Sequence, residues 1–147
     1  MDEVISKSTA ETAEFARVMA LSLKPKEEGA LIMGLYGELG AGKTTFMKYF
    51  ADALGVKETI QSPTFVIMKS FNLSIFPSFN KLIHIDAYRL ENPEELVKLG
   101  WNEIIADPHN LICIEWPERV AEIMPAHIVL KFEHVESGEN QRKISLA

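Results

Sequence analysis

Apolar residues near the start of the chain recur at the spacing of an α-helix and then give way to an uninterrupted apolar run. A capping-box pattern from Ser8 to Glu11 precedes this spacing, so we predict an amphipathic helix over 9–23 that packs on a sheet. Its apolar positions are Phe15, Val18, Met19 and Leu23. The run 30–36 is too apolar for a strand with one solvent-exposed face. It therefore predicts a central strand buried on both sides.

Short patterned runs predict the remaining strands. They lie at 82–86, 111–115, 127–133 and 141–146. The first two are apolar and each ends in an acid, whereas the last two alternate and predict an antiparallel hairpin at the end of the chain. A further strand is expected to begin within 59–68, and 71–81 would be a loop or hairpin connection.

Capping and breaking residues predict three short helices in the second half of the chain. Asn92 as a cap and Pro93 at the first helical position begin a helix that stops at Gly100. Two more short helices are expected, over 101–106 and from 117 toward 124. Strands that alternate with helices predict an α/β protein with a largely parallel central sheet.

Residues 37–44 match the phosphate-binding P-loop pattern G-x-x-x-x-G-K-[ST], between the strand 30–36 and a predicted helix over 45–54. They are Gly37, Glu38, Leu39, Gly40, Ala41, Gly42, Lys43 and Thr44. The glycines let backbone N–H groups converge on a phosphate, Lys43 adds a mobile, solvated cation, and the Thr44 hydroxyl can ligate Mg²⁺. The alternative is a turn that binds nothing, but the motif with both flanks favours a nucleotide.

Composition limits the class of protein further. The 147 residues fit one domain, 1–147, and 47% of them are hydrophobic, as in an ordinary globular core. The net charge of −6 argues against a broad RNA- or DNA-binding surface. The N-terminus carries acids without an apolar export signal, and no apolar stretch approaches the ~20 residues of a membrane span. Cys113 lies in an apolar run and is expected to be a buried hydrophobe. We therefore expect a cytoplasmic protein without a membrane anchor.

Asp86 and Glu115 are the acids best placed to complete the site. Each follows an apolar strand, and parallel strands deliver their carboxyl ends to the edge of the sheet that carries the P-loop. An acid there can hold Mg²⁺ through water or orient an attacking oxygen. For either acid alone, a solvated strand end is the alternative.

Two further residues admit two interpretations each. His84 lies two residues before Asp86 on the same face and is either a catalytic base or a structural histidine, which we favour. Trp116 follows Glu115 and is either an aromatic near the nucleotide or a partner, or part of the core. The other histidines lack metal-ligand spacing. They are His109, His127 and His134.

Missing motifs exclude several nucleotide-binding classes. The string Asn80-Lys81-Leu82-Ile83 lacks the aspartate of the guanine-reading N-K-x-D motif, which argues against a GTPase. No transporter-ATPase signature and no arginine-rich lid is present. On the residues alone, a small-molecule kinase remains the competing hypothesis to an ATPase.

In order and spacing, four strings of the chain resemble the TsaE (YjeE) family of bacterial ATPases over nearly its whole length. The strings are Gly37 to Phe46, Ser62 to Phe65, His84 to Leu90 with Pro93 to Leu96, and Ile114 to Pro117. The resemblance implies a three-layer P-loop NTPase fold that binds ATP with Mg²⁺ and hydrolyses it slowly alone. It also implies work with TsaB and TsaD, which attach a threonylcarbamoyl group to adenosine in ANN-decoding transfer RNAs. The chain would reset their complex between turnovers and would not perform the transfer. We expect it to meet transfer RNA through that complex, and whether it also contacts the RNA directly stays open.

The resemblance also implies a role for each matching residue. Asp86 and Lys43 would be catalytic, Asp86 by orienting water or supporting the metal. Thr44 and Glu115 would hold the metal, and Trp116 would be a functional position. Nucleotide contacts would come from Thr12 near the adenine, Gly37, Glu38, Leu39, Gly40, Ala41, Gly42, Lys43, Thr44, Thr45 and Arg142. The switch-like or partner-contacting loop would be Ser62, Pro63, Thr64 and Phe65.

Two questions stay open at this point. The connection 71–81 is long for the family, which implies either a docking surface or a longer hairpin. The chain could also be a nucleotide-gated binding module whose ATP hydrolysis is incidental.

Overall fold

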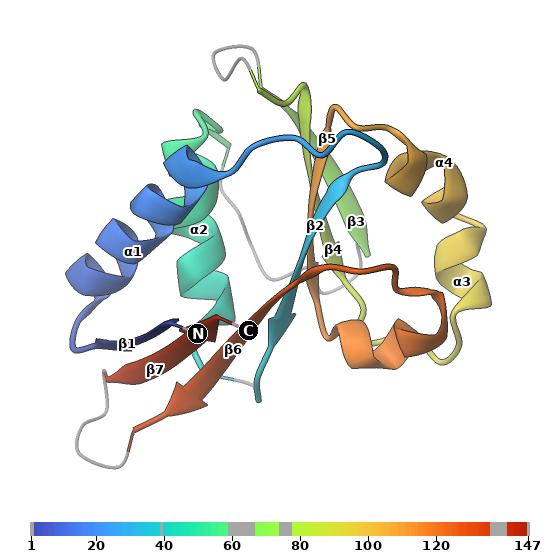
Figure 1. Cartoon of the computed structure of the whole chain (residues 1–147). Coiled ribbons are helices and arrows are strands. Elements are labelled where there is room, and N and C mark those ends of the chain that lie inside the picture. The colour runs from blue at the N-terminus through green and yellow to red at the C-terminus, as the bar shows by residue number, and fades with distance from the viewer. Residues whose placement is uncertain (1, 39, 59–66, 74–77, 136–140, 147) are drawn as a thin grey trace.

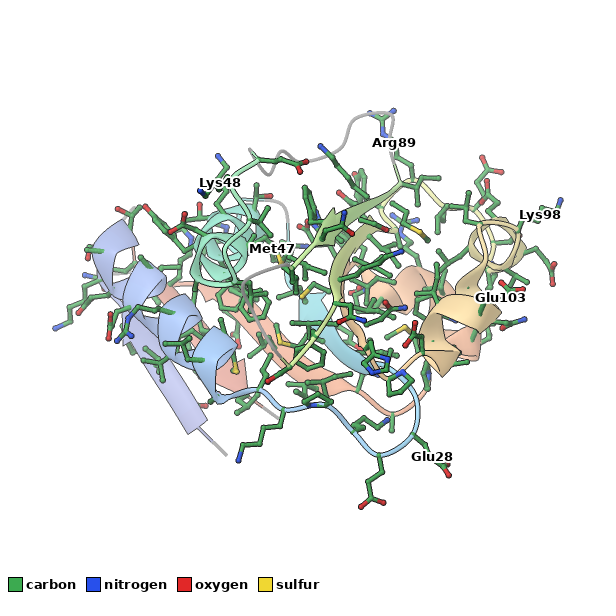
Figure 2. The ribbon with its side chains drawn as sticks, turned by 90° about the horizontal axis from the view of Figure 1, so that it is seen from above. Glu28, Met47, Lys48, Arg89, Lys98 and Glu103 are labelled. Atoms are coloured by element: carbon green, nitrogen blue, oxygen red, sulfur yellow. The ribbon has the colours of Figure 1, made fainter. Side chains whose placement is uncertain are left out.

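The described part of the chain forms a seven-stranded sheet with helices on both faces (Figure 1). The computed structural model describes residues 2–38, 40–58, 67–73, 78–135 and 141–146. The strands are β1 (Asp2–Ser6), β2 (Leu31–Tyr36), β3 (Met68–Asn72), β4 (Lys81–Asp86), β5 (Asn110–Glu115), β6 (Ile128–His134) and β7 (Arg142–Leu146). The helices are α1 (Thr9–Ser22), α2 (Lys43–Ala53), α3 (Glu94–Val97), α4 (Trp101–Ala106) and the 3₁₀ helix η1 (Pro117–Ile123).

The sheet is parallel at its centre and antiparallel at both edges. Its strand order is β1-β7-β6-β2-β5-β4-β3. The pairs β6–β2, β2–β5 and β5–β4 are parallel, while β7 pairs antiparallel with β6 and β1, and β3 pairs antiparallel with β4. This arrangement confirms the predicted α/β fold with a largely parallel central sheet and an antiparallel C-terminal hairpin.

Helices cover the two faces of the sheet unequally. Figure 1 shows α1 and α2 together on one face and α3 and α4 on the other. Successive strand residues alternate between these faces, so in β2 Met33 and Leu35 join the core under α1 and α2, whereas Ile32 joins the core under α3 and α4. By the same alternation, the functional candidates at the ends of β4 and β5 point to the α2 side, where the P-loop begins its helix.

Most of the predicted helices and strands are confirmed with small shifts at their ends, whereas α3 ends at Val97, before the expected stop at Gly100. The helix predicted over 9–23 is α1, with the Ser8 hydroxyl accepting the Glu11 N–H at 3.2 Å as its cap. The helix predicted from residue 45 begins at Lys43, because Gly42 in the left-handed region (φ 102°) forms its N-cap. The central strand, the helix over 101–106 and the C-terminal hairpin are found as predicted.

Two expectations about the N-terminal part are wrong. Residues 2–6 form the edge strand β1, which the sequence analysis did not predict; its pairing partner β7 lies at the other end of the chain. Val18 was assigned to the buried face of α1, yet it is 52% exposed. The helix instead buries smaller residues against α2, including Ala16 and Ala20.

Two details in the second half of the chain also differ from expectation. The connection predicted over 71–81 is a hairpin in which β3 already includes Phe71 and Asn72. Most of the strand predicted within 59–68 lies outside the described residues. Asn92 does not cap α3 with its side chain; instead the Glu95 carboxylate accepts the N–H groups of Glu91 and Asn92 at 2.7 and 3.2 Å.

In the part of the chain that the structure describes, no helix has the length and apolar character needed to cross a membrane.

Gly34 in β2 is required by a neighbouring side chain. A Cβ at this position would lie 2.8 Å from Cδ2 of His127, whose ring is fixed because Nδ1 donates to the Pro125 carbonyl at 2.8 Å and Nε2 accepts from the Tyr36 hydroxyl at 2.7 Å. We expect Gly34→Ala to cost about 1–3 kcal/mol of unfolding free energy, measured by urea denaturation. Adding His127→Ala should recover part of that loss. Equal midpoints for Gly34→Ala and the unchanged chain would contradict this account.

Candidate functional site

The P-loop leaves the C-terminal end of β2 and turns into α2 on a backbone that favours glycine at three positions. Gly37, Gly40 and Gly42 have φ values of 147°, 77° and 102°, which L-residues with a side chain rarely adopt. The Ala41 N–H donates to the Glu38 carbonyl at 3.1 Å and closes the tip of the loop. The loop is therefore built with the curvature that the motif predicts.

The C-terminal hairpin supports the P-loop from one side. A Cβ on Gly37 would lie 2.5 Å from the Phe132 carbonyl oxygen, and a Cβ on Gly42 would lie 3.3 Å from Cγ of Arg142. A Cβ on Gly40 would lie 4.0 Å from Cε1 of His134. Arg142 therefore lies beside the loop, and its contact with a nucleotide stays a prediction. Phe132 and His134 were missed, because only the pairing of β6 with β2 places them there.

The prediction of a solvated, mobile ammonium for Lys43 is wrong. The residue is only 4% exposed, its Nζ donates to the Gly37 carbonyl, and Nζ lies 3.7 Å from the centroid of the Trp116 ring. Burial lowers the pKa of Lys43, while the negative charges of Glu115, Glu118 and Asp86 act in the opposite direction. The Gly37 carbonyl and the face of the Trp116 ring are thus the contacts of the Lys43 ammonium.

Trp116 lies at the site rather than wholly in the core. Its ring is half-buried against Lys43 and lies 5.0 Å, centroid to centroid, from Tyr88, which is 38% exposed. The Arg119 guanidinium follows, 5.4 Å from the Tyr88 ring. Among the described residues, Trp116 is the only one besides glycines with positive φ (60°), so the backbone is held in an unfavourable conformation to aim this ring.

The two predicted acids lie side by side at the ends of β4 and β5. Asp86 and Glu115 are partners in the parallel register, and Glu115 is 3% exposed while Asp86 is half-buried. Burial raises the pKa of Asp86, the Glu115 charge raises it further, and the Tyr88 N–H, which donates to Oδ1 at 3.0 Å, lowers it. The alternative of a solvated strand end does not apply to Glu115.

His84 is a buried structural neighbour of these acids. It is 4% exposed, and its Nε2 lies 2.7 Å from Oε2 of Glu115. The interpretation of His84 as a structural histidine agrees with this burial.

The oxygen groups at this edge fit a magnesium ion that is shared with a ligand. Within the described ranges, no group of three or more His, Cys, Asp or Glu residues could hold a metal by itself. Mg²⁺ commonly takes only one or two carboxylates from the protein and fills its octahedron with water and phosphate oxygens. Thr44 in the first turn of α2 and the two strand-end acids supply the hard oxygen ligands that such an ion prefers.

Thr12 is buried where α1 meets β1. Its hydroxyl lies 2.6 Å from the Ser6 hydroxyl, which in turn donates to the Ser8 carbonyl at 2.8 Å. The Thr12 hydroxyl therefore donates to the Ser6 hydroxyl and links α1 to β1. A contact between Thr12 and an adenine stays a prediction. Other predicted site residues lie outside the described residues. They are Leu39, Ser62, Pro63, Thr64 and Phe65.

Comparison with known proteins gives a consistent result. A family model described as "Threonylcarbamoyl adenosine biosynthesis protein TsaE" matches residues 6–144. The protein of that name from Treponema pallidum is 37% identical over 143 residues, which cover 97% of this chain and 98% of the relative. The one from Bacillus subtilis is 36% identical over 138 residues, 92% of this chain and 78% of the relative. The crystal structure of YdiB from Bacillus subtilis superposes with a TM-score of 0.73 at 28% identity, covering 99% of this chain and 83% of that one.

The raised pKa of Asp86 gives a prediction for stability. Because folding raises the pKa, ionised Asp86 costs stability at neutral pH, and the cost disappears below the ordinary value of 3.8, where the acid is neutral in both states. We expect Asp86→Asn to unfold at a higher temperature than the unchanged chain at pH 7, with a gap that closes as the pH falls toward 3.8. Thermal melts across this range measure it.

The exposed Asp52 on α2 provides the matched control for this prediction. Asp52→Asn should shift the melting temperature little, and without the same closing gap. If both variants behaved alike, the environment of Asp86 would not be the cause.

Proposed function

Because the chain belongs to the TsaE family, we propose that it is an Mg²⁺-dependent ATPase that serves the threonylcarbamoyladenosine modification of transfer RNA. The observation that carries this proposal is the P-loop with Lys43 and two strand-end acids around it. The loop is suited to binding a triphosphate. Hydrolysis also needs acids that hold Mg²⁺ or orient the attacking water, and Asp86 and Glu115 are suited to these tasks.

The residues divide the work as follows. Backbone N–H groups of the loop would hold the phosphates, and Lys43 would leave the Gly37 carbonyl to contact the β- and γ-phosphates. Thr44 and Glu115 would hold Mg²⁺, which offsets charge on the phosphate oxygens when it is bound. Asp86, with Oδ1 held by the Tyr88 N–H, would orient the attacking water through its other oxygen.

The proposed role is accessory to the modification. TsaB and TsaD would attach the threonylcarbamoyl group, and this chain would reset their complex between turnovers in the cytoplasm. The net charge of −6 supports an indirect relation to transfer RNA, because a protein that gripped the phosphate backbone itself would need a basic surface. Residues 62–65 would respond to the γ-phosphate or to a partner.

One observation favours a second candidate, a nucleotide-gated binding module. The ring contact between Trp116 and Tyr88 links the P-loop lysine to an exposed side chain. Filling the loop could therefore alter a partner surface without hydrolysis. The Asp86→Asn variant distinguishes the two candidate functions. If it binds ATP and sustains repeated modification, the binding module is supported. If it binds the partners yet stalls after one cycle, the ATPase is supported.

We predict that ATP turnover is slow for the isolated chain and rises when TsaB and TsaD are added. Asp86→Asn should lower stimulated turnover by about 100-fold or more, since a positioned acid or base commonly contributes that much. Release of ADP and inorganic phosphate measures both. The absence of stimulation together with no ternary complex would refute the proposal, and a phosphorylated small molecule would point to a kinase instead.

Trp116 should report the filling of the loop by fluorescence. ATP is expected to draw Lys43 away from the Trp116 ring, which changes the emission of that residue. The chain's second tryptophan, Trp101, is fully buried with its Nε1 donating to the Ile123 carbonyl at 3.2 Å, and serves as the internal control. We expect Trp101→Phe to keep the ATP-dependent change and Trp116→Phe to lose it. An undiminished change in Trp116→Phe would contradict this prediction.

A further inference from the structure

The hydrogen bond between His84 and Glu115 is one of the few polar contacts buried in the sheet. Nε2 of His84 lies 2.7 Å from Oε2 of Glu115, and both side chains are 4% exposed. The two residues lie on adjacent parallel strands and point to the α2 side of the sheet. Water has little access to either group, so each depends on the other for its hydrogen bond.

The direction of this bond follows from chemistry. A carboxylate can only accept, so the imidazole carries its hydrogen on Nε2 and donates it to Glu115. One carboxylate oxygen is thereby engaged, and the ring on the neighbouring strand restricts how the group can turn. Oε2 faces His84, which leaves Oε1 as the oxygen that Glu115 offers to a ligand.

Asp86 is arranged in the same way. Its Oδ1 accepts the Tyr88 N–H at 3.0 Å, which leaves Oδ2. Within the described residues, each of the two adjacent acids therefore has one oxygen engaged by the protein and one oxygen remaining. Each of these hydrogen bonds takes up one lone pair and draws charge from the oxygen that accepts it, so the other oxygen of each acid is the stronger ligand for a metal ion.

This restriction distinguishes between the two common hard cations. Mg²⁺ takes six ligands in a strict octahedron at 2.0–2.1 Å, tolerates single carboxylate oxygens, and keeps several waters. Ca²⁺ is larger, takes six to eight oxygens, and gains from bidentate carboxylates. Acids that ligate most strongly through one oxygen each suit Mg²⁺ better than Ca²⁺.

We propose that His84 is a positioning residue that engages one oxygen of Glu115, favours ligation through the other, and so makes the nucleotide-metal site prefer Mg²⁺ over Ca²⁺. This inference rests on the proposed function to the extent that Glu115 serves the metal of a bound nucleotide. His84 itself touches neither nucleotide nor metal.

The test measures nucleotide binding rather than turnover. A non-hydrolysable ATP analogue is titrated calorimetrically into the full chain in EDTA, in Mg²⁺ and in Ca²⁺, and the ratio of each metal-containing Kd to the EDTA value is the readout. The variants are His84→Met, which removes the donor at similar volume, and His84→Gln, whose amide nitrogen reaches about as far as Nε2. Cys113→Ala is the packing control, because Cys113 is the buried register partner of His84 on β5.

The unchanged chain should bind the analogue more tightly in Mg²⁺ than in Ca²⁺. His84→Met should lose about 10-fold or more of the Mg²⁺-dependent tightening, as is typical when the residue that orients a metal-binding side chain is removed. Its Kd in EDTA should stay unchanged, and its ratio of Mg²⁺ to Ca²⁺ tightening should fall. His84→Gln and Cys113→Ala should both keep the preference of the unchanged chain.

The results that would overturn the inference differ from those that would overturn the proposed function. An unchanged Mg²⁺ effect or an unchanged Mg²⁺ preference in folded His84→Met refutes the role of His84 and leaves the ATPase proposal standing. If the unchanged chain binds the analogue under none of the three conditions, the proposed function fails and the inference fails with it. If His84→Met does not fold by circular dichroism, His84→Asn replaces it, because its shorter amide cannot reach Glu115; equal metal preference in His84→Asn and His84→Gln then refutes the inference.

Discussion

One ammonium and two carboxylates meet where the parallel strands end, and the burial of these charges constrains the whole site. Lys43 and Glu115 are almost fully buried, and Asp86 is half-buried beside them. Burial lowers the pKa of Lys43 and raises that of Asp86, so each charge is costly alone and is favoured by its opposite. The Glu118 charge also acts on Lys43, so negative charge outweighs this one ammonium at the edge of the sheet. Under the proposed function, a divalent cation would offset that excess.

Strand pairing holds these charges in place. The register that sets Asp86 beside Glu115 also sets Glu115 beside Leu35, two residues before the P-loop begins. A slip of one residue in either pair would turn an acid to the opposite face, away from α2. The other side of the loop depends on β6, whose Phe132 carbonyl lies where a side chain on Gly37 would be. The parallel core and the C-terminal hairpin therefore position the candidate site between them.

The predictable parts of this structure are those that depend on local pattern. The P-loop, the strands that end in acids and the helix over 101–106 follow from the spacing of apolar residues and from glycine chemistry. The strand β1 could not be predicted from residues 2–6 alone. Among the described residues it pairs only with β7, which lies more than a hundred residues away along the chain. The burial of Lys43 was missed for a related reason. It depends on the ring of Trp116, which only a left-handed backbone after β5 directs toward the loop.

The contacts of Lys43 also bear on how strongly a nucleotide can bind. The Gly37 carbonyl and the Trp116 ring satisfy the ammonium before any phosphate arrives, and a desolvated cation–π contact alone contributes about 2 kcal/mol. Under the proposed function, a phosphate would have to replace both contacts, which would offset part of its charge-assisted binding energy. The left-handed backbone at residue 116, which is costly for a residue other than glycine, also begins η1, because the Arg119 N–H donates to the Trp116 carbonyl at 3.0 Å. The ring of Trp116 contacts both Lys43 and Tyr88, and these contacts connect the loop to the surface.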